Sequence, residues 1–442
     1  MSHPTEKSAP AAPCGTGGCA TGANNSIQEL VRKQHKMEAG ETLRKVEHEF
    51  PDNPEAMGYF YDLFRKNYCD GTPLHDGKPV VGNLCVQVPD ELVRACGAVP
   101  VRLCNGAYTL DQIGAEGLPA RTCPLIKATM GAFQSQALPP FEDLALVVNP
   151  TTCDQKKKAA EQIGAMGYPV HTLEYPPVKE SEAAREYWRA AVRDFARTLP
   201  RHTGHRLTRR RLKAAIRDVD RAQAEYRRLH ALRQAAPAPI LGKDVFLVTN
   251  AYFFDEIGRW TDAVAKLNDE IEARAASGFA AAQRRAPRIL FTGSPPIFPN
   301  LKLPMLIEQS GAVVVADEVC SANRMLHDRV AVEEWFLYDM VDALADRYLK
   351  PCTCPIFDTS TDRQRRLKEM AEQFQVDGVV YQAFSGCQVY ELEHRAIAEA
   401  LQAAELPVMY IETDYSPDDM GQLSTRVEAF IESIKAKKRP RK

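Results

Sequence analysis

The segments RILFTG at residues 288–293 and AVVVA at residues 312–316 give the clearest fold signal in the chain. The first is an apolar run that ends in a glycine turn, and a helix-compatible stretch at 301–310 separates it from the second. Two further apolar runs, at 377–381 and 407–411, continue this alternation of strand and helix. Because parallel strands need helical crossovers, the pattern predicts a doubly wound parallel sheet.

A similar alternation appears in the first half of the chain. Apolar, strand-like runs lie at 79–82, 98–103, 144–148 and 168–173, with helix-compatible stretches among them. We therefore expect a second parallel sheet that is built in the same way. The predicted fold class is α/β, with two doubly wound parallel-sheet domains and an additional helical region.

Length and composition suggest where these domains begin and end. A chain of 442 residues exceeds one usual domain, so more than one hydrophobic core is expected. The first 25 residues are rich in Ala, Pro, Gly, Ser and Thr, a composition typical of disorder. The expected order is a disordered tail (1–25), N-terminal helices (26–74), a first α/β domain (75–180), a helical region (181–284) and a second α/β domain (285–437).

The charge pattern indicates neither a nucleic-acid nor a membrane partner. The net charge is -2, with 45% hydrophobic and 26% charged residues, as in ordinary globular proteins. The basic run at 209–211 is followed by interleaved acidic residues and lacks stacking aromatics, so it predicts a solvated helix face capped by Thr208. No stretch approaches the roughly 20 apolar residues of a membrane helix, and the expected location is cytoplasmic.

The cysteines are the strongest indication of function. In the reducing cytoplasm the twelve cysteines are not expected to form disulfides, so metal binding, redox chemistry or simple burial must explain them. Ligands of open α/β sheets bind where the strands end. Five cysteines follow predicted strands in this way: Cys85, Cys104, Cys153, Cys320 and Cys387.

Three more cysteines lie beside prolines in predicted loops. Cys123 precedes a proline, and Cys352 and Cys354 form a CxC pair flanked by Pro351 and Pro355. Proline stiffens a loop and removes an amide donor, which suits a cluster whose sulfurs need selected hydrogen bonds. The chain has no CxxC pair, so a structural zinc site is the weaker alternative.

The other four cysteines are interpreted differently. Cys14 and Cys19 lie in a glycine-rich stretch of the expected tail, where a flexible segment is the favoured interpretation. Cys69 and Cys96 fall in or beside helical patterns and are expected to be ordinary buried residues.

Several common nucleotide-binding and hydrolase motifs are absent from the sequence. There is no GxxxxGK(S/T) loop and no GxGxxG after a strand, so any ATP hydrolysis would take place on another protein. GxSxG and HExxH are also missing, which argues against a serine hydrolase and a zinc protease.

A set of short motifs runs along the chain in order. They are GNLC (82–85) leading into VPDEL (88–92), TCPLIK (122–127), TTCD (151–154) followed by three lysines, YQAFSGC (381–387) and ETDY (412–415). Together they resemble the 2-hydroxyacyl-CoA dehydratase and benzoyl-CoA reductase superfamily over roughly residues 75–435. Within it, the chain is most similar to the double-cubane-cluster reductases.

The resemblance implies two flavodoxin-like or Rossmann-like domains with an iron–sulfur cluster in the cleft between them. Carried over by motif, Cys123, Cys153 and Cys387 resemble the ligands of a 4Fe-4S cubane. An 8Fe-9S double cubane needs six thiolates, so two of the eight candidates would be spare. The other five candidates lie where double-cubane relatives carry cysteine: Cys85, Cys104, Cys320, Cys352 and Cys354.

The expected function is that of an oxygen-sensitive iron–sulfur reductase component. The resemblance implies a separate ATP-hydrolysing activator with its own iron–sulfur cluster, which delivers low-potential electrons, and a homodimer or heterodimer. The cluster would reduce a small molecule or a CoA thioester. Two alternatives stay open: a subunit of a heterodimeric benzoyl-CoA reductase or 2-hydroxyacyl-CoA dehydratase, and a non-catalytic electron-transfer protein. The segment 322–324 departs from the family pattern, which leaves cluster type and substrate open.

Overall fold

The computed structural model describes residues 20–72, 75–136 and 144–438 of the chain. Most of the tail expected at 1–25 lies outside these residues, as do Cys14 and Cys19. The described part begins with the helix α1 (Ala20–His48), followed by the short elements η1 (Glu55–Met57), α2 (Gly58–Phe64) and η2 (Arg65–Cys69). No helix in the described part is long and apolar enough to cross a membrane.

The first sheet consists of four parallel strands in the order β2-β1-β3-β4. Its strands are β1 (Val80–Asn83), β2 (Val99–Arg102), β3 (Leu144–Pro150) and β4 (Val170–Leu173). The apolar runs of the sequence lie at these positions, so this half of the fold prediction is confirmed.

The second sheet repeats this arrangement in the order β6-β5-β7-β8, again with all strands parallel. Its strands are β5 (Arg288–Gly293), β6 (Val313–Glu318), β7 (Gly378–Phe384) and β8 (Val408–Thr413). Strands β5, β6 and β7 are buried along their whole length, as expected for continuous apolar runs covered on both faces. Both orders match the first four strands of flavodoxin-like sheets, which confirms the predicted fold class.

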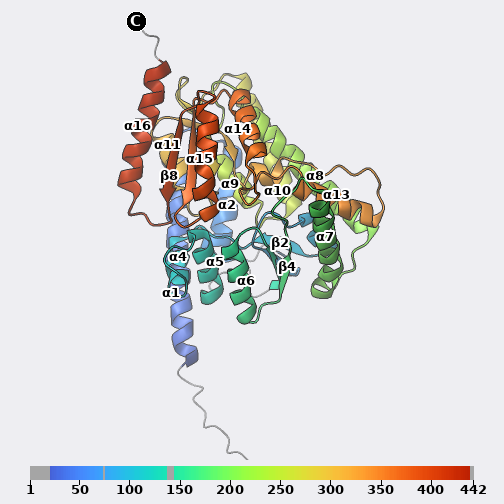
Figure 1. Ribbon diagram of the computed structural model, residues 1–442. Coiled ribbons are helices and arrows are strands. Elements are labelled where there is room, and N and C mark those ends of the chain that lie inside the picture. The colour runs from blue at the N-terminus through green and yellow to red at the C-terminus, as the bar shows by residue number, and fades with distance from the viewer. Residues whose placement is uncertain (1–19, 73–74, 137–143, 439–442) are drawn as a thin grey trace, which may run out of the picture.

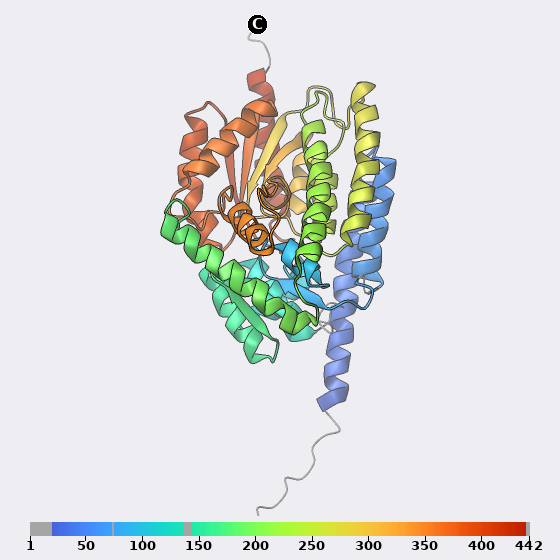
Figure 2. The ribbon, with the colours of Figure 1, turned by 90° about the vertical axis from the view of Figure 1, so that its right-hand side faces the viewer.

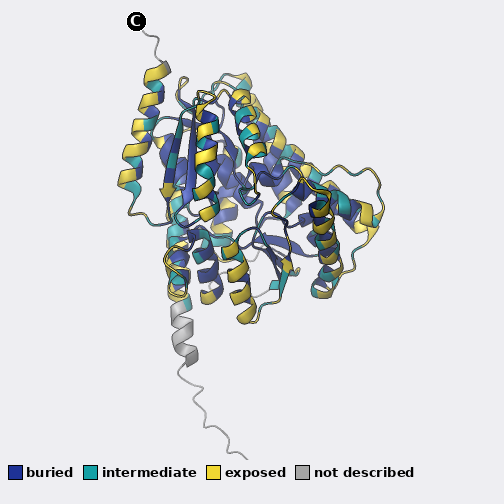
Figure 3. Cartoon of the chain, viewed as in Figure 1, coloured by how far each residue is buried: buried dark blue, intermediate teal, exposed yellow. Residues whose placement is uncertain are grey.

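Helices surround both sheets, and Figures 1 and 2 show the two α/β units one above the other. The exposed faces of the outer helices contrast with the buried strands in Figure 3. Up to β5 the helices are α3 (Asp90–Ala95), α4 (Tyr108–Ala115), α5 (Pro124–Ser135), α6 (Asp154–Ala165), α7 (Glu182–Thr203), α8 (Arg209–Leu232), α9 (Gly242–Ala251) and α10 (Ile257–Ala276). Beyond it are α11 (Lys302–Gln309), α12 (Asn323–Leu326), α13 (Leu337–Leu349), α14 (Thr361–Gln373), α15 (Gln388–Gln402) and α16 (Met420–Lys438).

Each α/β unit packs against helices that lie outside its own stretch of sequence. Helix α13 follows β6 of the second sheet, but it packs on α7 and shares a hydrophobic core with β1 and β3 of the first sheet. The indole Nε1 of Trp188 on α7 donates a hydrogen bond to the carbonyl oxygen of Ala345 on α13 at 2.8 Å. Conversely, α8, α9 and α10 contribute to the core of the second sheet. These contacts join the two units.

The predicted cap of α8 is confirmed. The Thr208 hydroxyl accepts a hydrogen bond from the backbone N–H of Arg211 at 3.3 Å, so the basic run forms the exposed first turn of a capped helix.

Candidate functional site

A cavity lies where the switch points of the two sheets meet. In each sheet the strand order reverses between two neighbours, β1 and β3 in the first and β5 and β7 in the second. Crevices outside the carboxyl ends of such strand pairs are the usual ligand sites of open α/β sheets. Residues that follow all four strands line the cavity, among them Cys85, Cys153, Ser294 and Cys387. Its volume is about 140 Å³, well above the space that one water needs.

Six thiols line this cavity, three from each α/β unit. They are Cys85, Cys123 and Cys153 from the first unit and Cys320, Cys354 and Cys387 from the second. The structure therefore brings together six of the eight cysteines that the sequence singled out. The remaining wall is largely apolar, with residues such as Leu125, Ile356 and Phe384.

Three of these thiols begin helices. Cys123, Cys153 and Cys387 are the N-cap residues of α5, α6 and α15. The Cys153 sulfur accepts a hydrogen bond from the backbone N–H of Lys156 at 3.4 Å. Helix N-termini carry partial positive charge and free N–H groups, which stabilise thiolate and other anions. The three cysteines with the most specific motifs thus share one position, at the N-terminus of a helix.

The side chain of Lys156 supplies positive charge to the cavity. Burial alone would lower the pKa of this ammonium group, but the neighbouring thiolates, Cys85 foremost, raise it above the usual value. The reverse holds for Cys85: burial would raise the pKa of its thiol, but Lys156 and a hydrogen bond from Thr152 lower it. Lys156 itself donates to the Thr152 hydroxyl at 3.2 Å.

Four of the other cavity thiols have raised pKa values. Burial raises the pKa of Cys153, of Cys320 and of Cys354. The hydrogen bond with Cys123 is the main cause of the raised pKa of Cys387. Neutral thiols are poor metal ligands, so any metal that bound here would have to displace their protons.

Two of the predicted ligand cysteines lie outside the cavity lining. Cys352 is buried, and its sulfur accepts a hydrogen bond from the Gln87 side-chain amide at 2.9 Å. Burial raises the pKa of Cys104 to about 12, and this thiol packs beside the core of the second sheet. Neither sulfur contributes to the surface that the six thiols form.

The arrangement suits a group of several metal atoms better than a single ion. Within the ranges that the structure describes, no three Cys, His, Asp or Glu side chains converge on one point as a single metal ion requires. Six thiols spread around a cavity fit a cluster whose inorganic core spans the distance between them. The donors are all sulfur, the ligand type that iron–sulfur clusters take.

Sequence reasoning did not identify the cations of the site. Lys156 lines the cavity and is the first of three consecutive lysines. The other two form surface ion pairs, Lys157 with Asp154 and Lys158 with Glu161. Arg324, from the segment that departs from the family pattern, also lines the cavity. Position 156 lies one helical turn after the Cys153 N-cap, and this spacing is the signal that could have distinguished it.

The family model described as 2-hydroxyglutaryl-CoA dehydratase, D-component, matches residues 85–434.

The chain belongs to this dehydratase D-component family.

Individual relatives cover most of the chain. The protein YjiM of Escherichia coli (strain K12), whose name marks it as a candidate dehydratase subunit, is 35% identical over 81% of this chain and 92% of its own length. The beta subunit of (R)-2-hydroxyglutaryl-CoA dehydratase from Acidaminococcus fermentans is 24% identical, with 81% and 93% covered. One of the benzoyl-CoA reductase subunits from Thauera aromatica is 22% identical, with 81% and 91% covered. The superfamily that the motifs resemble is thus confirmed.

Proposed function

We propose that the chain is the cluster-binding component of an oxygen-sensitive iron–sulfur enzyme that reduces or dehydrates a small molecule or a CoA thioester. The observation that carries this proposal is the set of six thiols around one cavity at the junction of both switch points. The names of the relatives, which are dehydratase and reductase subunits, support an enzymatic role.

The proposed ligands are the six cavity thiols, and the proposed cluster is a double cubane of the 8Fe-9S type. Its six thiolate positions equal the number of thiols on the cavity wall. Cys104 and Cys352 are then the two spare cysteines. A single 4Fe-4S cubane on Cys123, Cys153 and Cys387 is the smaller alternative, because all three are N-cap residues of helices that begin at the cavity.

The chain's own residues prepare this cavity for an anionic group. The N-termini of α5, α6 and α15 and the ammonium group of Lys156 offset the charge of the thiolates. The apolar wall, including Leu125 and Phe384, excludes water and keeps the local dielectric constant low. When bound, an iron–sulfur cluster supplies one-electron transfer at low potential.

The source of electrons is proposed to be a separate ATP-hydrolysing activator with its own iron–sulfur cluster. The sequence contains no nucleotide-binding loop of the common types, so the energy of ATP would enter through such a partner.

A heterodimer with a paralogous subunit is the second candidate assembly. The relatives in Clostridium sporogenes and Acidaminococcus fermentans are beta subunits, and the Thauera aromatica relative is also named as one subunit of its enzyme, so each belongs to a protein with several subunits. Activity of the purified chain with the activator alone would favour a homodimer. Activity only after addition of a paralogous subunit would favour the heterodimer.

Anaerobic purification followed by iron and acid-labile sulfide analysis tests the proposed cofactor. Roughly eight irons per chain are expected for the double cubane and roughly four for the single cubane, with an electron paramagnetic resonance signal after reduction. A colourless chain without iron, or one that holds zinc instead, would overturn the proposal. If the chain holds a cluster that can be reduced but turns over no substrate, the chain is an electron-transfer protein and not an enzyme.

A further inference from the structure

Arg324 presents an unpartnered donor at the wall of the cavity. Its side chain is 2% exposed and lines the cavity together with Cys320 and Cys354. Its Nη2 donates to the Tyr390 hydroxyl at 2.7 Å, whereas neither its Nε nor its Nη1 has a hydrogen-bond partner among the described residues. The Nε lies in an ion pair with Glu318, so the Nη1 is the nitrogen left without a partner in the described part of the protein. A buried donor without an acceptor costs about 1–3 kcal/mol, so an acceptor is expected in the working protein.

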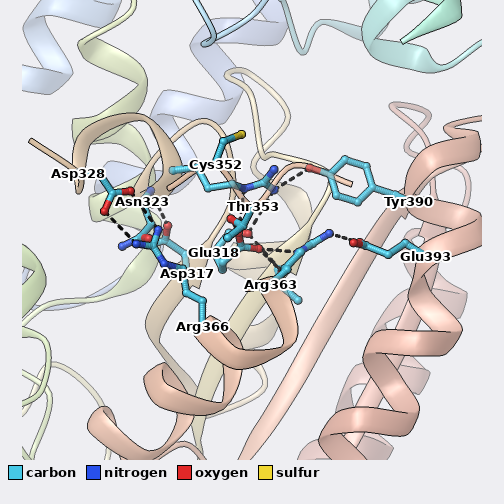
Figure 4. Close-up of polar contacts among 12 residues, drawn as sticks. Asp317, Glu318, Asn323, Asp328, Cys352, Thr353, Arg363, Arg366, Tyr390 and Glu393 are labelled. Atoms are coloured by element: carbon cyan, nitrogen blue, oxygen red, sulfur yellow. Dashed lines mark hydrogen bonds and ion pairs between the residues drawn. The ribbon is translucent and has the colours of Figure 1, made fainter. Parts of the chain in front are cut away.

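A network of buried charges fixes the position of Arg324. The carboxylate of Glu318 lies 2.9 Å from the Arg324 Nε and 2.9 Å from the Arg363 Nε, and it accepts a hydrogen bond from the Thr353 hydroxyl at 2.6 Å. Arg363 continues the network to Glu393, as Figure 4 shows. Two carboxylates and two guanidinium groups balance one another, so the network can be buried without a net charge.

The surroundings of Arg324 indicate what kind of acceptor its Nη1 lacks. Burial alone would lower the pKa of the Arg324 guanidinium group. Glu318 above all, and also Tyr390, Cys320 and Cys354, outweigh burial and raise this pKa above its usual value. The Glu318 carboxylate already accepts three hydrogen bonds, from Arg363, Thr353 and Thr292, besides its ion pair with Arg324. Of these neighbours, Tyr390, Cys320 and Cys354 also line the cavity, and the Tyr390 hydroxyl already accepts a hydrogen bond from the Arg324 Nη2. A sulfur acceptor on the cavity side is therefore the simplest partner.

We propose that Arg324 donates its free Nη1 hydrogens to sulfur of the bound cluster, on the side held by Cys320 and Cys354, and thereby raises the reduction potential of that cluster. This inference rests on the proposed function. A donor and a positive charge beside the sulfur stabilise the reduced cluster, which carries one more negative charge than the oxidised one. Arg324 would thus help the chain to accept an electron from a low-potential donor.

The test is the midpoint potential of the cluster in the full chain, measured anaerobically by a redox titration followed by electron paramagnetic resonance. Arg324→Lys keeps the charge but replaces the planar fork of donors. A double variant, in which Gln replaces both Glu318 and Arg324, serves if Arg324→Lys does not fold. It removes one charge of each sign, so the buried network stays neutral. Arg288→Lys is the matched control, because Arg288 is a buried arginine at the opposite end of β5 from the cavity.

A lower midpoint potential in the Arg324 variants, with normal iron and sulfide content, is the expected result. In the double variant the fall should correspond to roughly tenfold in the equilibrium constant of one-electron reduction, or about 59 mV. Arg288→Lys should leave the potential unchanged. A fully loaded variant with the wild-type potential would overturn the role of Arg324. Absence of iron from the wild-type chain and every variant would instead overturn the proposed function itself.

Discussion

The side-chain amide of Gln155 donates a hydrogen bond to the carbonyl oxygen of Gly386 at 2.9 Å, from the first α/β unit to the second. The oxygen of the same side chain accepts a hydrogen bond from the backbone N–H of Cys123, also at 2.9 Å. One carboxamide therefore ties the loop of Cys123 to the loop of Cys387. These are the two thiols whose contact crosses the junction of the units.

Replacing Gln155 by Glu is expected to weaken this link. A carboxylate can still accept from Cys123, but it cannot donate to Gly386, and the two facing oxygens repel each other. We expect a loss of about 1–3 kcal/mol in stability and a lower iron content per chain. Thermal unfolding and iron analysis measure the two effects. Gln162→Glu, the same change at an exposed site on the same helix, should behave as the wild type.

Gly386 tests the same junction through the backbone. Its φ is +82°, and a Cβ at this position would lie 2.2 Å from the carbonyl oxygen of Arg121, next to the loop of Cys123. Gly386→Ala should therefore push the two cysteine loops apart and reduce the iron content. Gly278 has a φ of +69° with nothing within 4 Å of an added Cβ, so Gly278→Ala carries the conformational strain alone. Equal iron loss in both variants would show that strain, not the close approach, matters.

The sequence predicts those parts of the fold that depend on neighbouring residues, and it does not predict contacts between distant segments. The apolar run and glycine turn of β5 and the apolar run of β6 are properties of neighbouring residues, and both strands were predicted at their observed places. The packing of α13 on α7 joins residues about 150 positions apart, for example Trp188 and Ala345, and no local pattern indicates such a contact.

For the candidate site, too, the sequence predicts the features that are local and misses those that depend on the tertiary structure. Strand-end position and motif identified the eight cysteines, because both can be read along the chain. Whether Cys352 or Cys354 faces the cavity depends on which way a loop turns in three dimensions, and only the structure separates the two. The role of Arg324 depends on Glu318 and Arg363, which come from different elements.

The buried histidine His35 predicts a pH dependence of stability. Its ring stacks on Tyr68 with 5.5 Å between centroids, and burial lowers the pKa of His35 to about 4. Above pH 6.5 the side chain is neutral in both the folded and the unfolded chain, so its full contribution is present. As the pH falls from 6.5 toward 4, only the unfolded chain gains the proton, and stability falls by up to about 1.4 kcal/mol per pH unit.

His35→Phe should remove this contribution while keeping an aromatic ring against Tyr68. Its melting temperature relative to the wild type is expected to rise as the pH is lowered from 6.5 to 4. His48→Phe is the control, because it makes the same change of side chain at a largely exposed position on the same helix. Parallel melting curves of wild type and His35→Phe across this range would contradict the burial argument.

The CxC pair gives the sharpest test of the ligand set. Cys354 lines the cavity and Cys352 does not, although only one residue separates them. Cys354→Ala is expected to lower the iron content and change the electron paramagnetic resonance signal. Cys352→Ala should keep the full iron content and cost about 1 kcal/mol of stability, because the Gln87 amide loses its sulfur acceptor. Cys104→Ala should also keep the full iron content, since Cys104 lies outside the cavity lining. Loss of iron in Cys352→Ala together with retention in Cys354→Ala would reverse the assignment, because the loop would then present the other sulfur to the cluster.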